Sequence, residues 1–206
     1  MIIIISSEEN FPDEAEIVNQ LFQEGLDLFH VRKPFINNQE MKDFLGLIDK
    51  AFCSQLVLHS HFELAKQYGI SRLHCREEDR MNGLYEKYVE SYIMSTSVHD
   101  INSFNTLGSE WEYAFLSPFF PSISKKGYGI EATILEESKE RYNQDVKLIA
   151  LGGINEKNVF EVLNTKVDGI ALLGVVWQSD HPVETFKNCK NEMVNYVQNK
   201  KVFENQ

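Results

Sequence analysis

Short apolar runs recur from one end of the chain to the other, and longer segments with helical spacing lie between them. The first run is Ile2–Ile5, four β-branched residues with no polar face, which is typical of a strand buried on both sides. Residues 13–24 follow, and their apolar positions fall on one face of a helix. A buried strand followed by an amphipathic helix is the repeating unit of parallel α/β proteins.

The same unit can be followed through the rest of the chain. The predicted strands are Ile2–Ile5, Leu28–Val31, 55–58, 71–74, 92–95, 113–116, Lys147–Leu151 and 168–173. The predicted helices are 13–24, 38–52, 62–68, 101–107, 133–142, Val159–Leu163 and 183–197. Eight strands in 206 residues favour a (β/α)8 TIM barrel over a doubly wound open sheet, which at this length has about five or six strands. We predict an α/β fold with one TIM-barrel domain over residues 1–206, and a frayed tail at 200–206.

Charge and cysteine content limit the partners. A formal net charge of −11 without a cluster of Lys and Arg argues against nucleic acid as a partner. Cys53, Cys75 and Cys189 lack disulfide-framework and metal-ligand spacing, which favours free thiols in a reducing compartment. The chain contains neither a signal peptide nor an apolar run of about 18 residues, so we expect a cytoplasmic protein without a membrane partner. We also expect it to form a homo-oligomer.

Polar side chains gather where the predicted strands end, and in a TIM barrel the chemistry lies at those carboxyl ends. The residues concerned are His30, Arg32, Lys33, His59, Ser60, His61, His74, Arg76, Glu78, Asp79, Ser97 and His99. Five of the six histidines are among them. A single histidine at a strand end is more often a packing residue than a catalyst. His30, His59 and His61 could instead bind a metal, although their spacing matches no common ligand pattern.

Glycines mark the ends of the last two predicted strands. Gly152 and Gly153 follow Lys147–Leu151 and precede a helix that we expect to begin near Glu156, while Gly174 follows the eighth strand. Backbone N–H groups at such glycines can approach a phosphate closely, and the helix dipole would add to the attraction. TIM barrels often bind phosphate in these two loops. The alternative is that the paired glycines only form a tight turn.

The loop after the sixth predicted strand, residues 117–129, combines hydroxyls, lysines and glycines. Ser122, Ser124 and Lys125 are suited to an anionic ligand, because hydroxyl groups orient oxygen atoms and lysine supplies positive charge. We interpret the loop as a lid over the site. A solvated basic loop is the alternative.

Taken together, these segments resemble the thiamine phosphate synthase/TenI family of small TIM barrels over nearly the whole chain. Residues 28–33 are similar to the family motif Q-x-R-x-K, residues 95–99 to G-x-S-x-H, and residues 117–125 to G-P-x-F-P-T-x-T-K. Residues 149–154 are similar to A-x-G-G-I, and residues 168–171 to A-D-G-x-A. Each motif is weak alone, but five in the family's order make a specific resemblance.

The chain departs from the synthase pattern at several positions. Synthases carry Asn-Asp after the third strand, where the Asp holds Mg²⁺, and this chain has His59-Ser60. Asp79 matches the second magnesium Asp, but one carboxylate and one hydroxyl hold Mg²⁺ poorly. The motif's Gln and last Lys fall on His30 and Pro34, and the family's Ser after strand eight falls on Gly174.

TenI-type members are similar to the chain at these points, and their activity is that of a thiazole tautomerase. The resemblance implies that thiazole phosphate binds through the glycines, the strand-six loop, Arg32, Lys33 and Ser97. It also implies that His99 moves the proton, because an imidazole both takes and returns a proton near neutral pH. His30 is our second catalytic candidate. Two alternatives remain: a thiamine phosphate synthase, the only case that requires Mg²⁺, and a binder of phosphorylated ligands without catalysis.

Overall fold

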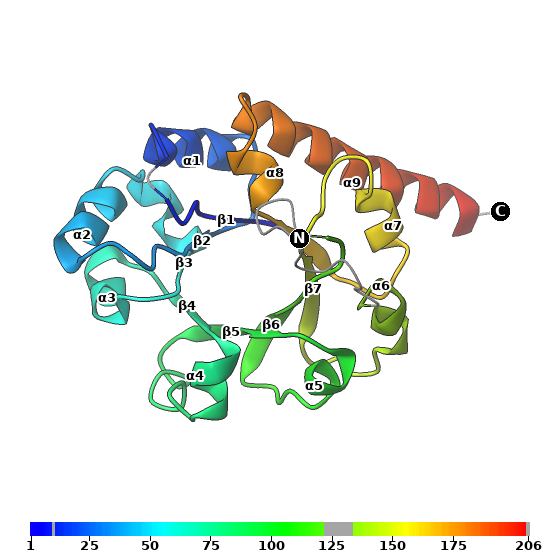
Figure 1. Cartoon of the computed structure of the whole chain (residues 1–206), viewed down its shortest axis with the longest axis horizontal. Coiled ribbons are helices and arrows are strands. Elements are labelled where there is room, and N and C mark those ends of the chain that lie inside the picture. Colours follow the sequence, from blue (N-terminus) through cyan, green and yellow to red (C-terminus); the bar gives the residue numbers. More distant parts are fainter. Residues whose placement is uncertain (10, 122–133, 205–206) are drawn as a thin grey trace.

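The computed structural model describes residues 1–9, 11–121 and 134–204, with side chains as far as residue 200. The strands are β1 Ile2–Ile5, β2 Leu28–Val31, β3 Leu56–Leu58, β4 Arg72–Cys75, β5 Ile93–Val98, β6 Trp111–Leu116, β7 Lys147–Leu151 and β8 Gly169–Leu172. All are parallel, and they follow one another in chain order around a closed barrel (Figure 1). β8 pairs with β1 through Ile2 and Ile170, which closes the ring. The predicted TIM barrel is confirmed.

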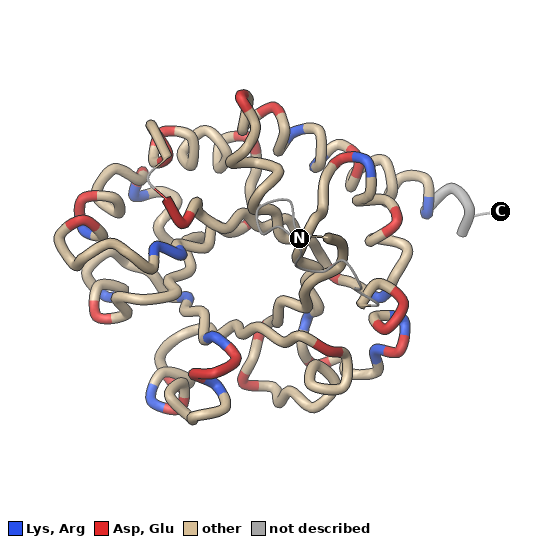
Figure 2. Tube along the Cα trace, viewed as in Figure 1, with Lys and Arg blue, Asp and Glu red and all other residues tan. Residues whose placement is uncertain are grey.

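The helices surround the barrel (Figure 1). They are α1 Glu14–Gln23, α2 Asn38–Gly46, α3 Ala65–Tyr68, α4 Glu77–Met81, α5 Ile101–Asn105, α6 Ile134–Glu137, α7 Val159–Leu163, α8 Gly174–Trp177 and α9 Pro182–Glu204. Short 3-10 helices occupy η1 Lys50–Gln55, η2 Phe62–Leu64 and η3 Ser138–Glu140. Acidic and basic residues interleave around this outer ring (Figure 2). Among the described helices, none has both the length and the apolar character needed to cross a membrane.

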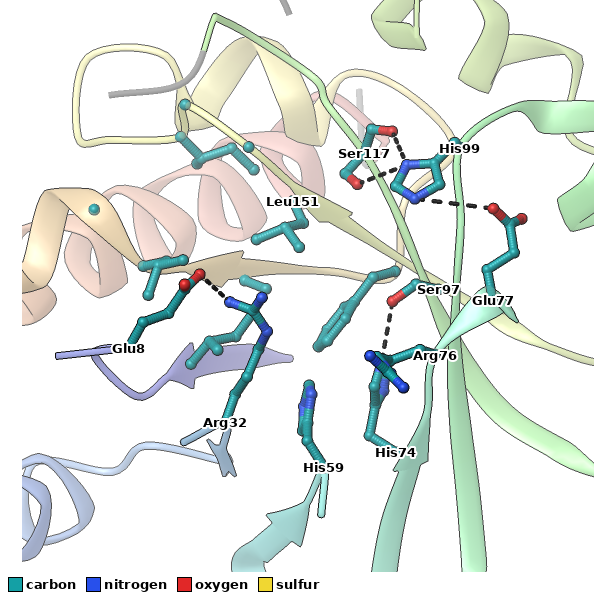
Figure 3. A pocket seen from close by; sticks show the side chains of 18 of the residues that line it. Glu8, Arg32, His59, His74, Arg76, Glu77, Ser97, His99, Ser117 and Leu151 are labelled. Atoms are coloured by element: carbon teal, nitrogen blue, oxygen red, sulfur yellow. Dashed lines mark hydrogen bonds and ion pairs between the residues drawn. The ribbon is translucent and has the colours of Figure 1, made fainter. Parts of the chain in front are cut away.

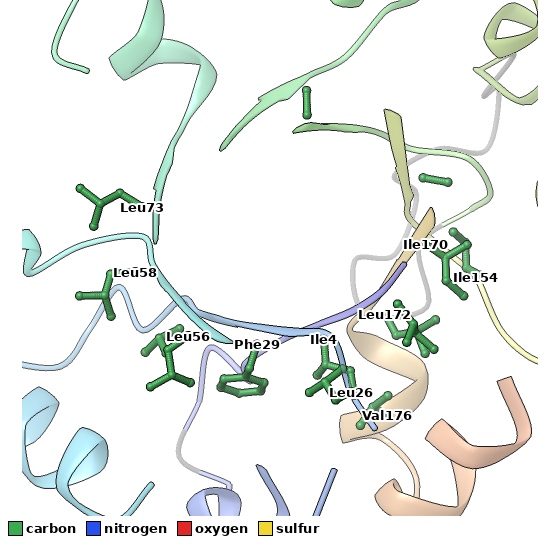
Figure 4. Close-up of a cluster of buried hydrophobic side chains, with 14 of the residues drawn as sticks. Ile4, Leu26, Phe29, Leu56, Leu58, Leu73, Ile154, Ile170, Leu172 and Val176 are labelled. Atoms are coloured by element: carbon green, nitrogen blue, oxygen red, sulfur yellow. The ribbon is translucent and has the colours of Figure 1, made fainter. Parts of the chain in front are cut away.

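The strand residues bury two separate hydrophobic clusters. In β1, Ile2 and Ile4 belong to the cluster between the strands and the helices, whereas Ile3 and Ile5 belong to the cluster inside the barrel. Figure 4 shows the outer cluster, including Ile4, Phe29 and Leu172, on the helix side of the strands. Alternate side chains of one short run therefore stabilise both layers, which explains why β1 has no polar position.

Several element boundaries differ from the predicted ones. The helix predicted over 38–52 ends at Gly46, and a 3-10 helix then begins after Asp49, whose carboxylate accepts a hydrogen bond from the backbone N–H of Ala51. Strand β5 extends to Val98, because it pairs with β6 as far as Leu116. The sequence did not predict α4 or α8, both of which are single short turns beside the barrel mouth.

The last helix is longer than predicted. It runs from Pro182 to Glu204 and packs against α1, α7 and α8 (Figure 1). The helix predicted over 183–197 therefore continues through most of the segment for which the sequence suggested a frayed tail. Its side chains Phe186 and Cys189 are fully buried, which fixes the first half of the helix on the barrel.

Candidate functional site

A cavity of about 440 Å³ opens at the carboxyl ends of the strands (Figure 3). One side, here called the glycine wall, consists of Gly152, Gly153 and Gly174 after β7 and β8. The other side, the histidine wall, consists of His59, His74, Ser97 and His99 from β3, β4 and β5. Because all strands are parallel, residues from distant parts of the chain meet at this single end.

His99 stands directly after β5, with half of its side chain exposed. Its Nδ1 lies 3.1 Å from the carbonyl oxygen of Ser117. The Ser117 hydroxyl lies farther from the same nitrogen, at 3.4 Å. The shorter contact is to a carbonyl, which only accepts, so it favours the neutral tautomer with hydrogen on Nδ1 and the lone pair on Nε2. Nε2 lies 3.9 Å from a carboxylate oxygen of Glu77, which also lines the cavity (Figure 3). The imidazole can accept a proton at Nε2, and Glu77 would stabilise the resulting cation.

The backbone conformation of the glycine wall leaves no room for side chains at Gly152 and Gly153. Gly152 and Gly153 have φ values of 107° and 63°, which are unfavourable for other residues. A Cβ at Gly153 would lie 2.5 Å from the carbonyl oxygen of Pro121, and one at Gly152 would lie 3.0 Å from Cα of Pro118. The backbone N–H of Phe120 donates to the Gly152 carbonyl at 3.1 Å. These glycines therefore make a tight turn and also line the cavity, so the two interpretations of the sequence are compatible.

The assigned bounds of helix α7 begin three residues after the expected start near Glu156. Helix α7 begins at Val159, and the residues before it form a turn held by two asparagines. The side chain of Asn158 accepts from the Asn155 backbone at 2.8 Å, and that of Asn155 accepts from the Lys157 backbone at 2.9 Å. Together they have the form of a helix cap at Asn155, and the backbone N–H of Val159 donates to the Asn155 carbonyl at 3.0 Å. A helical turn therefore starts directly after Asn155, two residues beyond Gly153.

Two arginines reach the cavity, and the neighbouring lysine does not. Arg32 forms an ion pair with Glu8 at the cavity wall (Figure 3). Arg76 lines the cavity as well. Lys33, predicted to bind substrate, is 4% exposed, forms a buried ion pair with Glu14 and does not line the cavity. Its side chain lies on the helix side because successive residues of an extended chain point to opposite faces.

The predicted magnesium position does not present a free carboxylate. Both oxygens of Asp79 accept hydrogen bonds from Arg76, at 2.9 and 3.2 Å. The hydroxyl of Ser60 lies 2.9 Å from Nδ1 of His61. Asp79 and Ser60 line a smaller hollow beside the main cavity rather than the cavity itself. Mg²⁺ prefers several oxygen ligands, so these two residues do not fit it as they stand.

The histidines assemble differently from the predicted metal set. His61 starts a 3-10 helix and is not part of the group; His74 takes its place beside His30 and His59. The ligand atoms of these three rings lie within 4.8 Å of one another. The His59 and His74 rings are stacked, 4.1 Å apart and only 20° from parallel. A coordinating imidazole directs its lone pair in the ring plane, so two nearly parallel rings do not converge on one ion.

His30, our second catalytic candidate, is fully buried and does not line the cavity. Burial holds the pKa of His30 and of His59 well below the ordinary histidine value, and the neighbouring His74 lowers both further. Burial lowers the pKa of His74 to about 3, with a smaller contribution from Arg32. The three rings are therefore neutral near pH 7.

Sequence reasoning found several cavity residues and missed others. Those it named that line the cavity are Arg32, His59, His74, Arg76, Glu78, Ser97, His99, Gly152, Gly153 and Gly174. It missed Glu8 and Glu77, which no motif marked. It also took Tyr113 for an ordinary apolar strand residue, although alternation along β6 places its hydroxyl inside the barrel, 2.7 Å from His30. Ser122, Ser124 and Lys125 lie outside the described residues.

Comparisons with known proteins agree with this architecture. A thiamine-phosphate synthase from Clostridium tetani is 25% identical over 171 residues, which is 80% of either chain. One from Oceanobacillus iheyensis is 23% identical over 189 residues, covering 86% of this chain and 90% of that protein.

Solved structures share the fold. Thiamine phosphate pyrophosphorylase from Pyrococcus furiosus superposes with a TM-score of 0.78 at 18% identity, over 95% of this chain and 96% of that one. The protein of that name from Bacteroides thetaiotaomicron gives 0.74 at 23% identity, over 94% and 96%. The family model described as thiamine monophosphate synthase matches residues 1–176. Since this match covers well over half of the 206 residues, the chain belongs to the thiamine monophosphate synthase/TenI family.

Proposed function

We propose that the protein is a thiazole tautomerase of the TenI type, which moves one proton on a carboxythiazole phosphate and thereby makes its ring aromatic. The observation that carries the proposal is the setting of His99. Its Nδ1 is held by the Ser117 carbonyl, and Nε2 is left available beside Glu77 at the cavity wall. A positioned group of this kind is what a proton transfer requires.

The cavity offers separate places for the two anionic groups of such a ligand. The phosphate is assigned to the glycine wall, where backbone N–H groups can come close to its oxygens. The carboxylate is assigned to Arg32 and Arg76, whose guanidinium groups can form paired hydrogen bonds with it. The ring then lies between these ends, near Nε2 of His99.

The reaction is balanced without any leaving group. Nε2 of His99 takes the proton from one ring atom, the imidazolium is stabilised by Glu77, and the same proton is returned to a different atom of the ligand. No metal takes part in these steps. The substitution of the magnesium Asp by Ser60, and the engagement of Asp79 by Arg76, are compatible with this chemistry.

A thiamine phosphate synthase is the second candidate, because the relatives of Clostridium tetani and Oceanobacillus iheyensis carry that name. That reaction joins a pyrimidine pyrophosphate to thiazole phosphate and releases pyrophosphate. Mg²⁺ would neutralise the leaving pyrophosphate, and Asp79 would have to exchange Arg76 for the ion.

Two incubations of purified protein separate these candidates. The first contains the unisomerised thiazole phosphate carboxylate with EDTA, and the second contains pyrimidine pyrophosphate, thiazole phosphate and Mg²⁺. We expect product in the first only. Product in the second only would establish the synthase, and binding without turnover in either would establish a non-catalytic binder.

The three cysteines are buried and unpaired, which supports our proposal that the protein works in the reducing cytoplasm. We propose a homo-oligomer as well, and light scattering would test it.

A further inference from the structure

Three side chains inside the barrel form a short hydrogen-bonded row that ends at the cavity. The Tyr113 hydroxyl lies 2.7 Å from Nε2 of His30, and Nδ1 of His30 lies 2.8 Å from Nε2 of His59. Tyr113 is 1% exposed and His30 is fully buried, whereas His59 is partly exposed and lines the cavity. The row therefore joins a residue buried in the barrel to one that a ligand can touch.

The hydrogen of the Tyr113 hydroxyl decides the direction of the row. Burial raises the pKa of Tyr113, so the hydroxyl keeps its hydrogen, and a buried donor without an acceptor costs free energy. Nε2 of His30 is the acceptor at hydrogen-bond distance. Burial and the neighbouring His74 hold the pKa of His30 well below its ordinary value, so the ring carries one hydrogen, which then lies on Nδ1.

The direction set by Tyr113 continues to His59. Nδ1–H of His30 donates to Nε2 of His59, which must therefore carry a lone pair. Burial, followed by the neighbouring histidines and arginines, holds the pKa of His59 well below its ordinary value, so this ring is neutral as well. Its single hydrogen then lies on Nδ1. The opposite direction would leave a lone pair on Nδ1, so the row decides whether His59 presents a donor or an acceptor.

Nδ1 of His59 faces the cavity. The Nε2 edge of the ring is occupied by the row, and one ring face stacks on His74 at 4.1 Å. In Figure 3 the ring points from the end of β3 into the cavity, and Arg32 and Arg76 flank it. Nδ1 has no hydrogen-bond partner among the residues that the structure describes, and the one buried side-chain nitrogen or oxygen without a partner in that part of the chain is Nε of Arg80. Nδ1 is therefore open to a ligand.

The two flanking arginines are already paired with carboxylates. Arg32 donates to Glu8 through Nη1, and Arg76 donates to Asp79 through Nε and Nη2. Two positive charges thus stand beside two negative ones, which weakens the attraction of the pair for a further anion. A neutral N–H beside them adds a hydrogen bond to the anion at a point where the charge is largely balanced.

We propose that Tyr113 and His30 fix His59 in the tautomer with hydrogen on Nδ1, and that this N–H binds the ligand carboxylate beside the two arginines. The proposal rests on the proposed function, which places the carboxylate there. His59 touches the ligand, and Tyr113 and His30 are positioning residues that act through it. The transferred proton does not pass through His59, so the role of His99 is unchanged.

This arrangement selects for a hydrogen-bond acceptor on the ligand. A carboxylate oxygen accepts from Nδ1–H, whereas an amino group or a metal ion needs the lone pair that this tautomer does not present. Thiazole phosphate without the carboxylate loses the contact and keeps its phosphate at the glycine wall. The preference for the carboxylated ligand should therefore depend on His59.

Nitrogen NMR of ¹⁵N-histidine-labelled protein measures the tautomer directly and needs neither ligand nor turnover. We expect neutral His30 and His59 rings at pH 7 with hydrogen on Nδ1, and the spectrum of His59→Phe assigns the His59 signals. In Tyr113→Phe, which removes only the hydroxyl, the His59 tautomer should no longer be fixed. A native His59 ring with hydrogen on Nε2, or an unchanged tautomer in Tyr113→Phe, would overturn the proposal.

Calorimetry with two ligands measures the carboxylate contact. The aromatic carboxythiazole phosphate and thiazole phosphate differ only in the carboxylate. We expect His59→Phe to weaken binding of the first about tenfold or more and to change binding of the second by less than about twofold. His61→Phe is the matched control, because His61 does not line the cavity, and it should change neither affinity.

Tyr113→Phe gives a second, milder test that keeps the His59 ring in place. Its loss of affinity for the carboxylated ligand should follow the fraction of His59 that NMR shows without hydrogen on Nδ1, because only the remaining fraction can bind. Native affinity despite a changed tautomer would overturn the proposal, and this result decides the question if His59→Phe does not fold.

The remaining outcomes separate this proposal from the proposed function. Equal losses for both ligands in a folded His59→Phe protein would overturn the carboxylate contact, and native turnover in the same preparation would leave the tautomerase standing. A native protein that does not isomerise its ligand, but has hydrogen on Nδ1 of His59 and the expected difference between the two ligands, would overturn the proposed function and leave the carboxylate contact standing.

Discussion

The two walls line the same cavity, but backbone forms one of them and side chains form the other. The glycine wall consists of backbone at the ends of β7 and β8. The loop after β6 contacts it, where the backbone N–H of Phe120 donates to the Gly152 carbonyl. The histidine wall consists of side chains from β3, β4 and β5, held by hydrogen bonds that reach residues of β2 and β6. One wall depends on backbone conformation and the other on a polar network, so binding and proton transfer should respond to different substitutions.

Acidification should cause the largest change in the free energy of unfolding, and this change should come from the histidine wall and not from the glycine wall. In the unfolded chain the histidines gain protons as pH falls below about 6.5, whereas His74 in the folded protein stays neutral until about pH 3. The unfolded state then binds more protons, so the free energy of unfolding falls over this window by roughly 1 kcal/mol per pH unit for each of the three buried histidines. Denaturant titrations between pH 7 and pH 4 measure this slope.

A matched pair of variants assigns the effect to the histidine wall. His74→Gln should reduce the slope by roughly 1 kcal/mol per pH unit. His181→Gln, at an exposed position before α9, should leave it unchanged. Equal slopes for the native protein and His74→Gln would show that His74 is not a neutral buried group.

Substitution of Lys33 should cause the second largest loss of stability, and it should leave both walls of the cavity unchanged. Lys33→Met leaves Glu14 without its partner in a buried setting, and burial already raises the pKa of Glu14. We expect a loss of about 3–5 kcal/mol in the free energy of unfolding with unchanged phosphate affinity of the folded protein. Calorimetry with inorganic phosphate and thermal unfolding give the two numbers; weakened binding at normal stability would return Lys33 to the site.

The glycine wall should show the smallest of these stability effects. Gly153→Ala must adopt an unfavourable φ and place its Cβ against Pro121, at a cost of about 1–3 kcal/mol. We also expect phosphate binding to weaken by more than about tenfold, equivalent to about 1.4 kcal/mol.

Gly69→Ala is the control for that substitution. Gly69 has a similar φ of +68°, but a Cβ there meets no atom within 4 Å. It should reproduce the strain and keep the phosphate affinity. If both variants lose the same stability and neither loses affinity, the glycine wall only forms a turn.

The glycine wall could be predicted from the sequence, and most of the histidine wall's organisation could not. Gly152 and Gly153 follow a readable strand, and their effect is local, so their place in the chain was enough. The histidine network depends on which strand residues point inward and how neighbouring strands align. The sequence suggested His61 beside His59, whereas the structure places His74 there. Nearness in the sequence gives no information about the direction in which a ring points.

The fold was predicted better than its boundaries for the same physical reason. Eight buried strands define the barrel by their number and spacing, and an error of a few residues does not change it. Local hydrogen bonds decide the boundaries. The Asp49 side chain caps the 3-10 helix that follows α2, and Asn155 with Asn158 caps the turn that leads into α7.

The central claim is that His99 transfers a proton without a metal, and one measurement tests it most directly. Turnover of the thiazole phosphate carboxylate is followed for the native enzyme and for His99→Asn, both in EDTA and both checked for folding. We predict that the native enzyme keeps its full rate in EDTA and that His99→Asn loses roughly 10²–10⁴ in kcat, the usual contribution of a positioned acid and base, with little change in KM. A fully active His99→Asn enzyme, or a native enzyme that stops in EDTA, would contradict the account.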